Sequence, residues 1–310
     1  MWAYVVRRLL YAIPVLLGVT LITFLLFNVV GGDPARSMAG KNAKEADLQK
    51  IREQYGLDGS LPEQYGRFLG EVVTFDFGRS FRTKQRVGAM IAEGAGPSLA
   101  LALPAFFMAS LLGIALGLFT AYFRGSLADV VLRTASVAAM SISSLAYVIL
   151  GQYLLAYRWR LFPVFGFEWS LVGTVFLVLP AMIWIMLSVG TDVRFYRAVM
   201  LEEMRTDYVR TAAAKGLRTR SILFKHVLRN SLIPVITRLV LSIPFLFLGS
   251  LLLESFFGIP GLGALTVNAV TNNDWPVLKA VVVIGAMLYV FGVLVSDVLY
   301  AAVDPRVRLK

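Results

Sequence analysis

Long apolar runs restrict the fold of this chain more than any other feature. Six stretches of at least 22 residues contain few charges: 9–30, 98–123, 134–157, 169–191, 231–256 and 278–303. About 20 apolar residues in a helix cross a bilayer, where every backbone polar group must be hydrogen-bonded within the protein. Hydrophobic residues make up 58% of the chain and charged residues 16%, against about half and a quarter in soluble domains. The sequence therefore predicts an all-α integral membrane protein with about six transmembrane helices.

The segments between the runs divide the chain further. Residues 31–97 hold ten Lys or Arg and nine Asp or Glu, which predicts a small folded insert outside the membrane. We expect four parts: the N-terminus and first transmembrane helix at 1–30, the insert at 31–97, a membrane core at 98–303 with a polar loop at 192–230, and a tail at 304–310.

Basic residues predict the orientation of the chain. Loop 192–230 has nine Lys or Arg against four Asp or Glu, and six helices put it on the same side as Arg7, Arg8 and the basic tail. Lys and Arg collect in short cytoplasmic loops. We therefore expect both termini and loop 192–230 to be cytoplasmic, and residues 31–97, 158–168 and 257–277 to lie outside.

Composition excludes several chemistries. In a membrane protein, the net charge of +11 is better explained by orientation than by nucleic acid, since no basic segment is interleaved with stacking aromatics. The chain has no cysteine and a single histidine, His226, so thiol catalysis and zinc–thiolate sites are excluded. A phosphate loop needs Gly-x4-Gly-Lys-Ser/Thr, but Gly40-Lys41 is followed by Asn42, and Ala35 stands in place of the first glycine. We expect no catalytic, metal or cofactor site.

The polar loop contains the pattern of a short helix. Thr206 or Asp207 is suited to cap its start, and Gly216 to adopt a left-handed conformation beyond its end. Small side chains between them, from Thr211 to Ala214, allow another protein to approach the backbone closely. Taken alone, the pattern fits a surface connector near lipid headgroups equally well.

The order of residues in this loop resembles the cytoplasmic "EAA" loop of binding-protein-dependent ABC importer permeases, above all the dipeptide/oligopeptide/nickel permease family. The resemblance rests on Tyr208-Val209-Arg210-Thr211-Ala212, Ala214-Lys215-Gly216-Leu217 and His226-x-Leu228-Arg229-Asn230-Ser231. Fragments along nearly the whole chain resemble the B-type permease of that family, among them Gly32-Asp33-Pro34-Ala35, Asp76-Phe77-Gly78-Arg79-Ser80 and Ile259-Pro260-Gly261-Leu262-Gly263.

The resemblance implies a type I ABC importer permease fold in a prokaryotic inner membrane. It implies that the loop forms a coupling helix seated on a cytoplasmic ATPase, through Arg205, Tyr208, Thr211, Ala212, Ala213 and Gly216. The implied partners are a homologous second permease, two ATPase subunits that bind ATP and Mg, an extracytoplasmic substrate-binding protein, a peptide-like substrate and the lipid bilayer, with no nucleic acid.

The chain departs from the family pattern in two places. Arg210-Thr211-Ala212 stands where the general motif has Glu-Ala-Ala, so the acid is missing. Where the family often has Ile-Pro-Ser-Phe, this chain has Ile142-Ser143-Ser144-Leu145. Because proline interrupts helical hydrogen bonding, its absence predicts a straighter third transmembrane helix.

Polar residues inside the apolar runs are costly and suggest further roles. Arg238 and Asp297 lie at similar depth in the last two runs, which suggests an ion pair between them, and Glu254 and Lys279 match in depth near the outer end. A polar translocation path is suggested by Ser141, Ser143, Ser144, Trp184 and Met186, although serines in membrane helices often bond only their own backbone. Ala109, Gly113, Gly117 and Ala121, spaced by four, favour close helix packing within the bundle over contact with a partner permease.

Two other classes of function are alternatives to an importer permease. A secondary transporter or channel is the main alternative, but such proteins often show internal repeats and buried carboxylates, and neither is prominent here. A membrane-embedded enzyme would need a Ser–Lys or paired-carboxylate site, and no such constellation is visible. The sequence thus favours an importer permease subunit that is not itself an enzyme.

Overall fold

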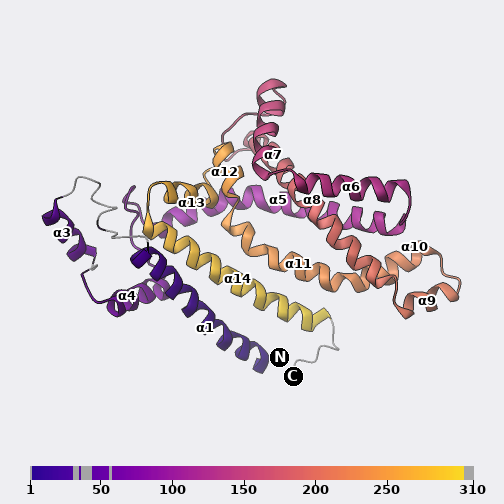
Figure 1. Ribbon diagram of the computed structural model, residues 1–310, viewed down its shortest axis with the longest axis horizontal. Coiled ribbons are helices and arrows are strands. Elements are labelled where there is room, and N and C mark those ends of the chain that lie inside the picture. The colour runs from indigo at the N-terminus through magenta and orange to yellow at the C-terminus, as the bar shows by residue number, and fades with distance from the viewer. Residues whose placement is uncertain (1, 31–34, 36–43, 56–57, 304–310) are drawn as a thin grey trace.

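The computed structural model describes residues 2–30, 35, 44–55 and 58–303, and long helices dominate it (Figure 1). Within the described residues, five helical stretches are long and apolar enough to cross a membrane, and a sixth is obtained if a bent pair forms one span. The predicted all-α membrane architecture with about six transmembrane helices is therefore confirmed. The predicted insert at 31–97 lies partly outside the described residues, and the predicted tail at 304–310 lies wholly outside them.

The spanning helices follow the predicted apolar runs. They are α1 (Trp2–Leu25) with the π-helical turn η1 (Leu26–Val30), α5 (Val87–Tyr122), α6 (Leu127–Ser141) with α7 (Ser144–Gly151) and η2 (Gln152–Arg158), α8 (Val175–Glu203), α11 (Leu228–Leu248) and α14 (Trp275–Val303). The shorter elements are α3 (Glu45–Tyr55), α4 (Leu61–Thr74), η3 (Val172–Thr174), α9 (Asp207–Ala214), α10 (Thr219–Ser221), η4 (Ile222–Val227), α12 (Leu251–Phe257) and α13 (Leu262–Thr271).

Several helices extend past the apolar runs that predicted them. Helix α5 begins at Val87 and α8 continues to Glu203, because a helix continues in water beyond the bilayer while hydropathy marks only its apolar part. The fifth predicted run is broken instead. Gly249 has φ +71° and ψ 179°, a conformation open essentially to glycine alone, and it separates α11 from α12.

Helix α5 and helix α8 pack closely along the small-residue stripe. A Cβ atom added at Gly113 would lie 2.7 Å from the Cβ of Asp192, and one added at Gly117 would lie 2.8 Å from the Cβ of Tyr196. Such distances are too short for any larger side chain. The stripe therefore serves packing within the bundle, as its spacing favoured.

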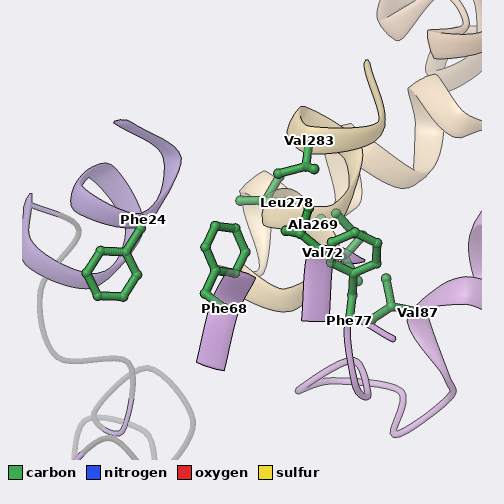
Figure 2. Close-up of a cluster of buried hydrophobic side chains, with 10 residues drawn as sticks. Phe24, Phe68, Val72, Phe77, Val87, Ala269, Leu278 and Val283 are labelled. Atoms are coloured by element: carbon green, nitrogen blue, oxygen red, sulfur yellow. The ribbon is translucent and has the colours of Figure 1, made fainter. Parts of the chain in front are cut away.

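Helix α4 is held against the end of α1 and the start of α14 by an apolar cluster. Phe24 of α1, Phe68 and Val72 of α4, and Leu278 and Val283 of α14 are buried together (Figure 2). A capping box fixes the start of α4: the side chain of Glu63 accepts a hydrogen bond from the backbone N–H of Ser60 at 2.9 Å. The buried aromatic contacts make this end of the bundle one packed unit.

Hydrogen bonds to Asp274 attach a second part of this region, the loop between α4 and α5, to the bundle. The carboxylate of Asp274, before α14, accepts hydrogen bonds from the hydroxyl of Ser80 and from the backbone N–H of Phe81, the latter at 2.9 Å. Asp274 is only 4% exposed. The loop between α4 and α5 is therefore tied to the loop between α13 and α14.

The third transmembrane segment bends sharply without a proline. Helices α6 and α7 meet at 92°, and α7 projects away from the other helices in Figure 1. Ile142 and Ser143 adopt extended conformations with ψ of 132° and 139°. The hydroxyl of Tyr147 donates to the carbonyl of Ala139 at 3.0 Å across the break, which satisfies a backbone group that the bend exposes. The expectation of a straighter helix was therefore wrong.

Candidate functional site

Two features of the structure are candidate sites: a short helix at one end of the molecule and a cavity between three spanning helices. The short helix, α9, has the predicted boundaries. Thr206 is its N-cap residue, with φ −71° and ψ 156°, and Gly216 beyond its end has φ +77°. The left-handed Gly216 ends the helix as expected, whereas the hydroxyl of Thr206 makes no capping bond and donates instead to the carbonyl of Glu203 at 2.6 Å.

The six residues implied for ATPase coupling separate into two groups. Arg205, Thr211, Ala213 and Gly216 are exposed. Ala212 is only 6% exposed and packs inward, and the hydroxyl of Tyr208 donates to the carboxylate of Glu203. Ala212 and Tyr208 therefore hold α9 in place in this structure, while the other four are open to a partner.

Helix α9 is anchored to the membrane core by a buried cluster. Val209 and Ala212 pack with Tyr196 and Met200 of α8 and with Leu223 of η4. Helix α8 itself is continuous from Val175 to Glu203. Helix α9 is therefore packed directly onto the end of a long, continuous transmembrane helix.

The cavity lies between α5, α8 and α11 and has a volume of about 340 Å³. Its charged end contains Asp192 and Arg238, and its walls combine hydroxyl groups with aromatic rings. Hydroxyls come from Ser110, Ser188, Thr191 and Ser242, and the rings from Phe106, Trp184, Tyr196 and Phe245. An amphipathic cavity of this kind is typical of a binding site for a small polar solute.

Arg238 pairs with Asp192 and not with Asp297. Its Nε and Nη2 atoms donate to Oδ1 of Asp192 at 3.0 and 2.8 Å, and its guanidinium lies 4.8 Å from the ring centroid of Phe195. Asp297 lies instead beside Arg8 of α1, with Nε 3.1 Å from Oδ2. The predicted Arg238–Asp297 pair was wrong, because equal depth in the membrane does not fix which faces of two helices meet.

The outer pair suggested by depth is likewise not formed. Both oxygens of Glu254 are taken by Ser98 and by backbone N–H groups, including that of Gly263 at 2.7 Å. Lys279 donates to Asn28 of η1 and lies over the ring of Phe68, 5.4 Å from its centroid. Glu254 and Lys279 are therefore each hydrogen-bonded to residues of other elements and not to each other.

Of the residues suggested for a translocation path, Trp184 alone lines this cavity. Met186, on the same helix, is 53% exposed on another face. Ser141 donates its hydroxyl to the carbonyl of Val137 at 2.9 Å, the backbone-bonding alternative for a helical serine. Ser143 and Ser144 are exposed at the bend between α6 and α7.

Sequence reasoning missed Asp192 as a site residue. It is the first charge after the fourth apolar run and was counted with the polar loop. The sequence did hold one indication: Asp192 directly follows the apolar run 169–191, and a helix that continues past the run places it beside the membrane core. Among the residues that the structure describes, no three His, Asp or Glu side chains gather in a way that suits a metal ion.

Comparison with known proteins agrees with this architecture. Residues 113–309 match the family described as binding-protein-dependent transport system inner membrane component, and residues 1–102 match the corresponding N-terminal family. An oligopeptide transport system permease protein of Bacillus subtilis is 36% identical, over 99% of this chain and 100% of the relative.

Other relatives cover this chain to the same extent. A putative peptide transport system permease protein of Brucella abortus is 36% identical over 99% of each chain. A glutathione transport system permease protein of Pectobacterium atrosepticum is 34% identical over 99% of each chain. The chain therefore belongs to the binding-protein-dependent transport system inner membrane components.

Proposed function

We propose that this chain is one of two permease subunits of an ATP-driven importer for peptides or related small solutes, and that α9 couples it to cytoplasmic ATPase subunits. The observation that carries the proposal is the position of α9: small, exposed residues on a short helix that is packed onto the end of α8. The full-length similarity to oligopeptide, peptide and glutathione permeases supports the class of cargo.

Energy would enter through partner subunits, since the sequence has no phosphate loop. The two ATPases would bind ATP and Mg, and their closure would move α9 and, through the continuous helix α8, the cavity lined by Trp184 and Asp192. A substrate-binding protein would deliver cargo from outside, and a homologous second permease would complete the pathway.

This arrangement requires α9 and both termini on the cytoplasmic side. The Arg8–Asp297 contact joins the first turns of α1 to the last turns of α14, so the two terminal helices begin and end on the same side of the bundle. The excess of Lys and Arg in 192–230 supports cytoplasmic placement of that side.

Copurification tests the coupling. The tagged chain is expressed with its gene neighbours, and bound ATPase subunits and their activity are measured with and without Ala213→Asp. Ala213 is exposed on α9, and a carboxylate forced into a dry interface without a partner weakens binding by roughly hundredfold or more. Ala46→Asp, on the exposed face of α3, is the matched control.

The expected result is that two ATPase subunits copurify with the wild type and with Ala46→Asp, and are lost or uncoupled from peptide in Ala213→Asp. Retention of fully coupled ATPases by Ala213→Asp would show that α9 is not the contact. A wild-type chain that purifies alone and stable would overturn the importer proposal and favour a secondary transporter.

A further inference from the structure

The cavity between α5, α8 and α11 separates charge from apolar surface. Arg238 and Asp192 lie at one end, while Leu246, eight residues further along α11, lies at the other. At 1.5 Å per residue this places the two ends roughly 12 Å apart along the helix. Hydroxyl groups of Ser188 and Ser242 occupy the walls between them. Such a lining offers partners to charged groups, peptide amides and apolar side chains alike.

The carboxylate of the ion pair in this cavity is bonded on one side only. Both bonds from Arg238 to Asp192 fall on Oδ1, and Arg238 also bonds the hydroxyl of Tyr196, so Oδ2 of Asp192 takes no part in these bonds. The arginine side chain is 32% exposed and the aspartate side chain 13%. Phe195 supports one face of the guanidinium, which orients its planar fork without occupying its donors.

Charge balance indicates which kind of ligand the Arg238–Asp192 pair can bind. A peptide with free ends carries an ammonium and a carboxylate, and either charge alone is costly to move through a region poor in water. Arg238 and Asp192 together are neutral, as the zwitterion is. Because Arg238 and Asp192 are in contact, the peptide must bend so that its two ends lie side by side. In that conformation, an exchange in which the peptide carboxylate meets Arg238 and its ammonium meets Asp192 leaves no charge without a partner.

We propose that this cavity is a peptide-binding site of the permease and that the Arg238–Asp192 pair recognises the charged ends of the peptide. The inference rests on the proposed transport function and adds to it the residues and the ligand chemistry. The alternative is an ion pair that only ties α8 to α11, in which case the peptide's end groups make no difference to the cavity.

The absence of cysteine from the chain allows a direct test of occupancy. A single Ser242→Cys substitution places a thiol on the cavity wall, and a small water-soluble thiosulfonate reagent modifies it in the reconstituted complex. The modification rate is measured with trialanine and with N-acetyl-trialanine amide, which has neither terminal charge. Ser143→Cys, exposed at the α6–α7 bend and away from the cavity lining, is the matched control.

Trialanine should slow the modification of Ser242→Cys, and the blocked peptide should need about tenfold to hundredfold higher concentration for the same protection, since hydrogen bonds to charged groups are lost. The Asp192→Asn/Arg238→Gln double variant removes both charges and leaves no single charge unpaired. In it, the two peptides should protect equally. The rate at Ser143→Cys should not change with either peptide.

Three results would overturn the proposal: no protection by trialanine, equal protection by both peptides in the wild-type background, or a preference for trialanine that survives in the double variant. Copurified ATPase, measured on the same samples, separates this outcome from failure of the transport proposal. If ATPases bind and respond to Ala213→Asp while peptide protection fails, only the recognition role of the cavity is wrong.

Discussion

Replacing Glu254 should loosen the packing of α12 and α13, and the structure gives the size of the effect. Its carboxylate is 0% exposed. It accepts hydrogen bonds from Ser98 Oγ at 2.8 Å and from the backbone N–H groups of Ser250, Gly263 and Ala264 at 3.1, 2.7 and 3.1 Å. Gly261, the N-cap residue of α13, has no side chain to cap the helix, so Glu254 of α12 satisfies that first turn instead.

Glu254→Ala leaves the backbone N–H groups of Ser250, Gly263 and Ala264 without their acceptor. A buried donor left unsatisfied costs about 1–3 kcal/mol, so the three together cost about 3–9 kcal/mol. At roughly 2 °C per kcal/mol for a chain of this size, the midpoint of thermal unfolding should fall by about 6–18 °C. Glu254→Gln keeps one acceptor but turns an amide donor toward other donors, so its loss should be intermediate.

Thermal unfolding in detergent at a fixed scan rate measures the effect, with Glu93→Ala, an exposed position on α5, as control. Hydrogen exchange at Gly263 and Ala264 gives a local measure and should accelerate in Glu254→Ala. A midpoint no lower than that of Glu93→Ala, with unchanged exchange in α13, would refute the role of Glu254 as the cap of that helix.

Further substitutions test the packing of α5, α6 and α8. Gly117→Ala should destabilise the protein by about 1–3 kcal/mol through overpacking, since its Cβ would lie 2.8 Å from that of Tyr196. Gly88→Ala, with nothing within 4 Å of the added Cβ, should be neutral or stabilising by up to about 1 kcal/mol. Equal effects of the two substitutions on the midpoint of thermal unfolding would contradict the close contact. Asp129→Asn weakens two bonds from Arg197, at 3.0 and 2.9 Å, to a carboxylate that is 2% exposed, and should cost about 1–3 kcal/mol, since one acceptor oxygen remains and Arg197 keeps some contact with solvent. Asp207→Asn, in the exposed pair with Arg210, should leave the unfolding midpoint unchanged, and a similar loss in both variants would show that burial is not what strengthens the first pair.

Local sequence determined the features that depend on few residues or on neighbours along the chain. The apolar runs located the spanning helices, because a bilayer excludes any apolar segment of that length that is not helical. Thr206 and Gly216 marked the ends of α9, because caps act within a single turn. The spacing of Gly113 and Gly117 predicted close packing, since residues four apart share one helix face.

Tertiary structure decided which faces meet. Arg238 and Asp297 matched in depth, yet each helix can turn about its axis, and packing of α11 on α8 and of α1 on α14 gave them the partners Asp192 and Arg8. The 92° bend needed no proline, and the hydroxyl of Tyr147 bonds the carbonyl of Ala139 across the break. Glu254 caps a helix from another element. Such contacts join residues far apart in sequence, and only the folded chain brings them together.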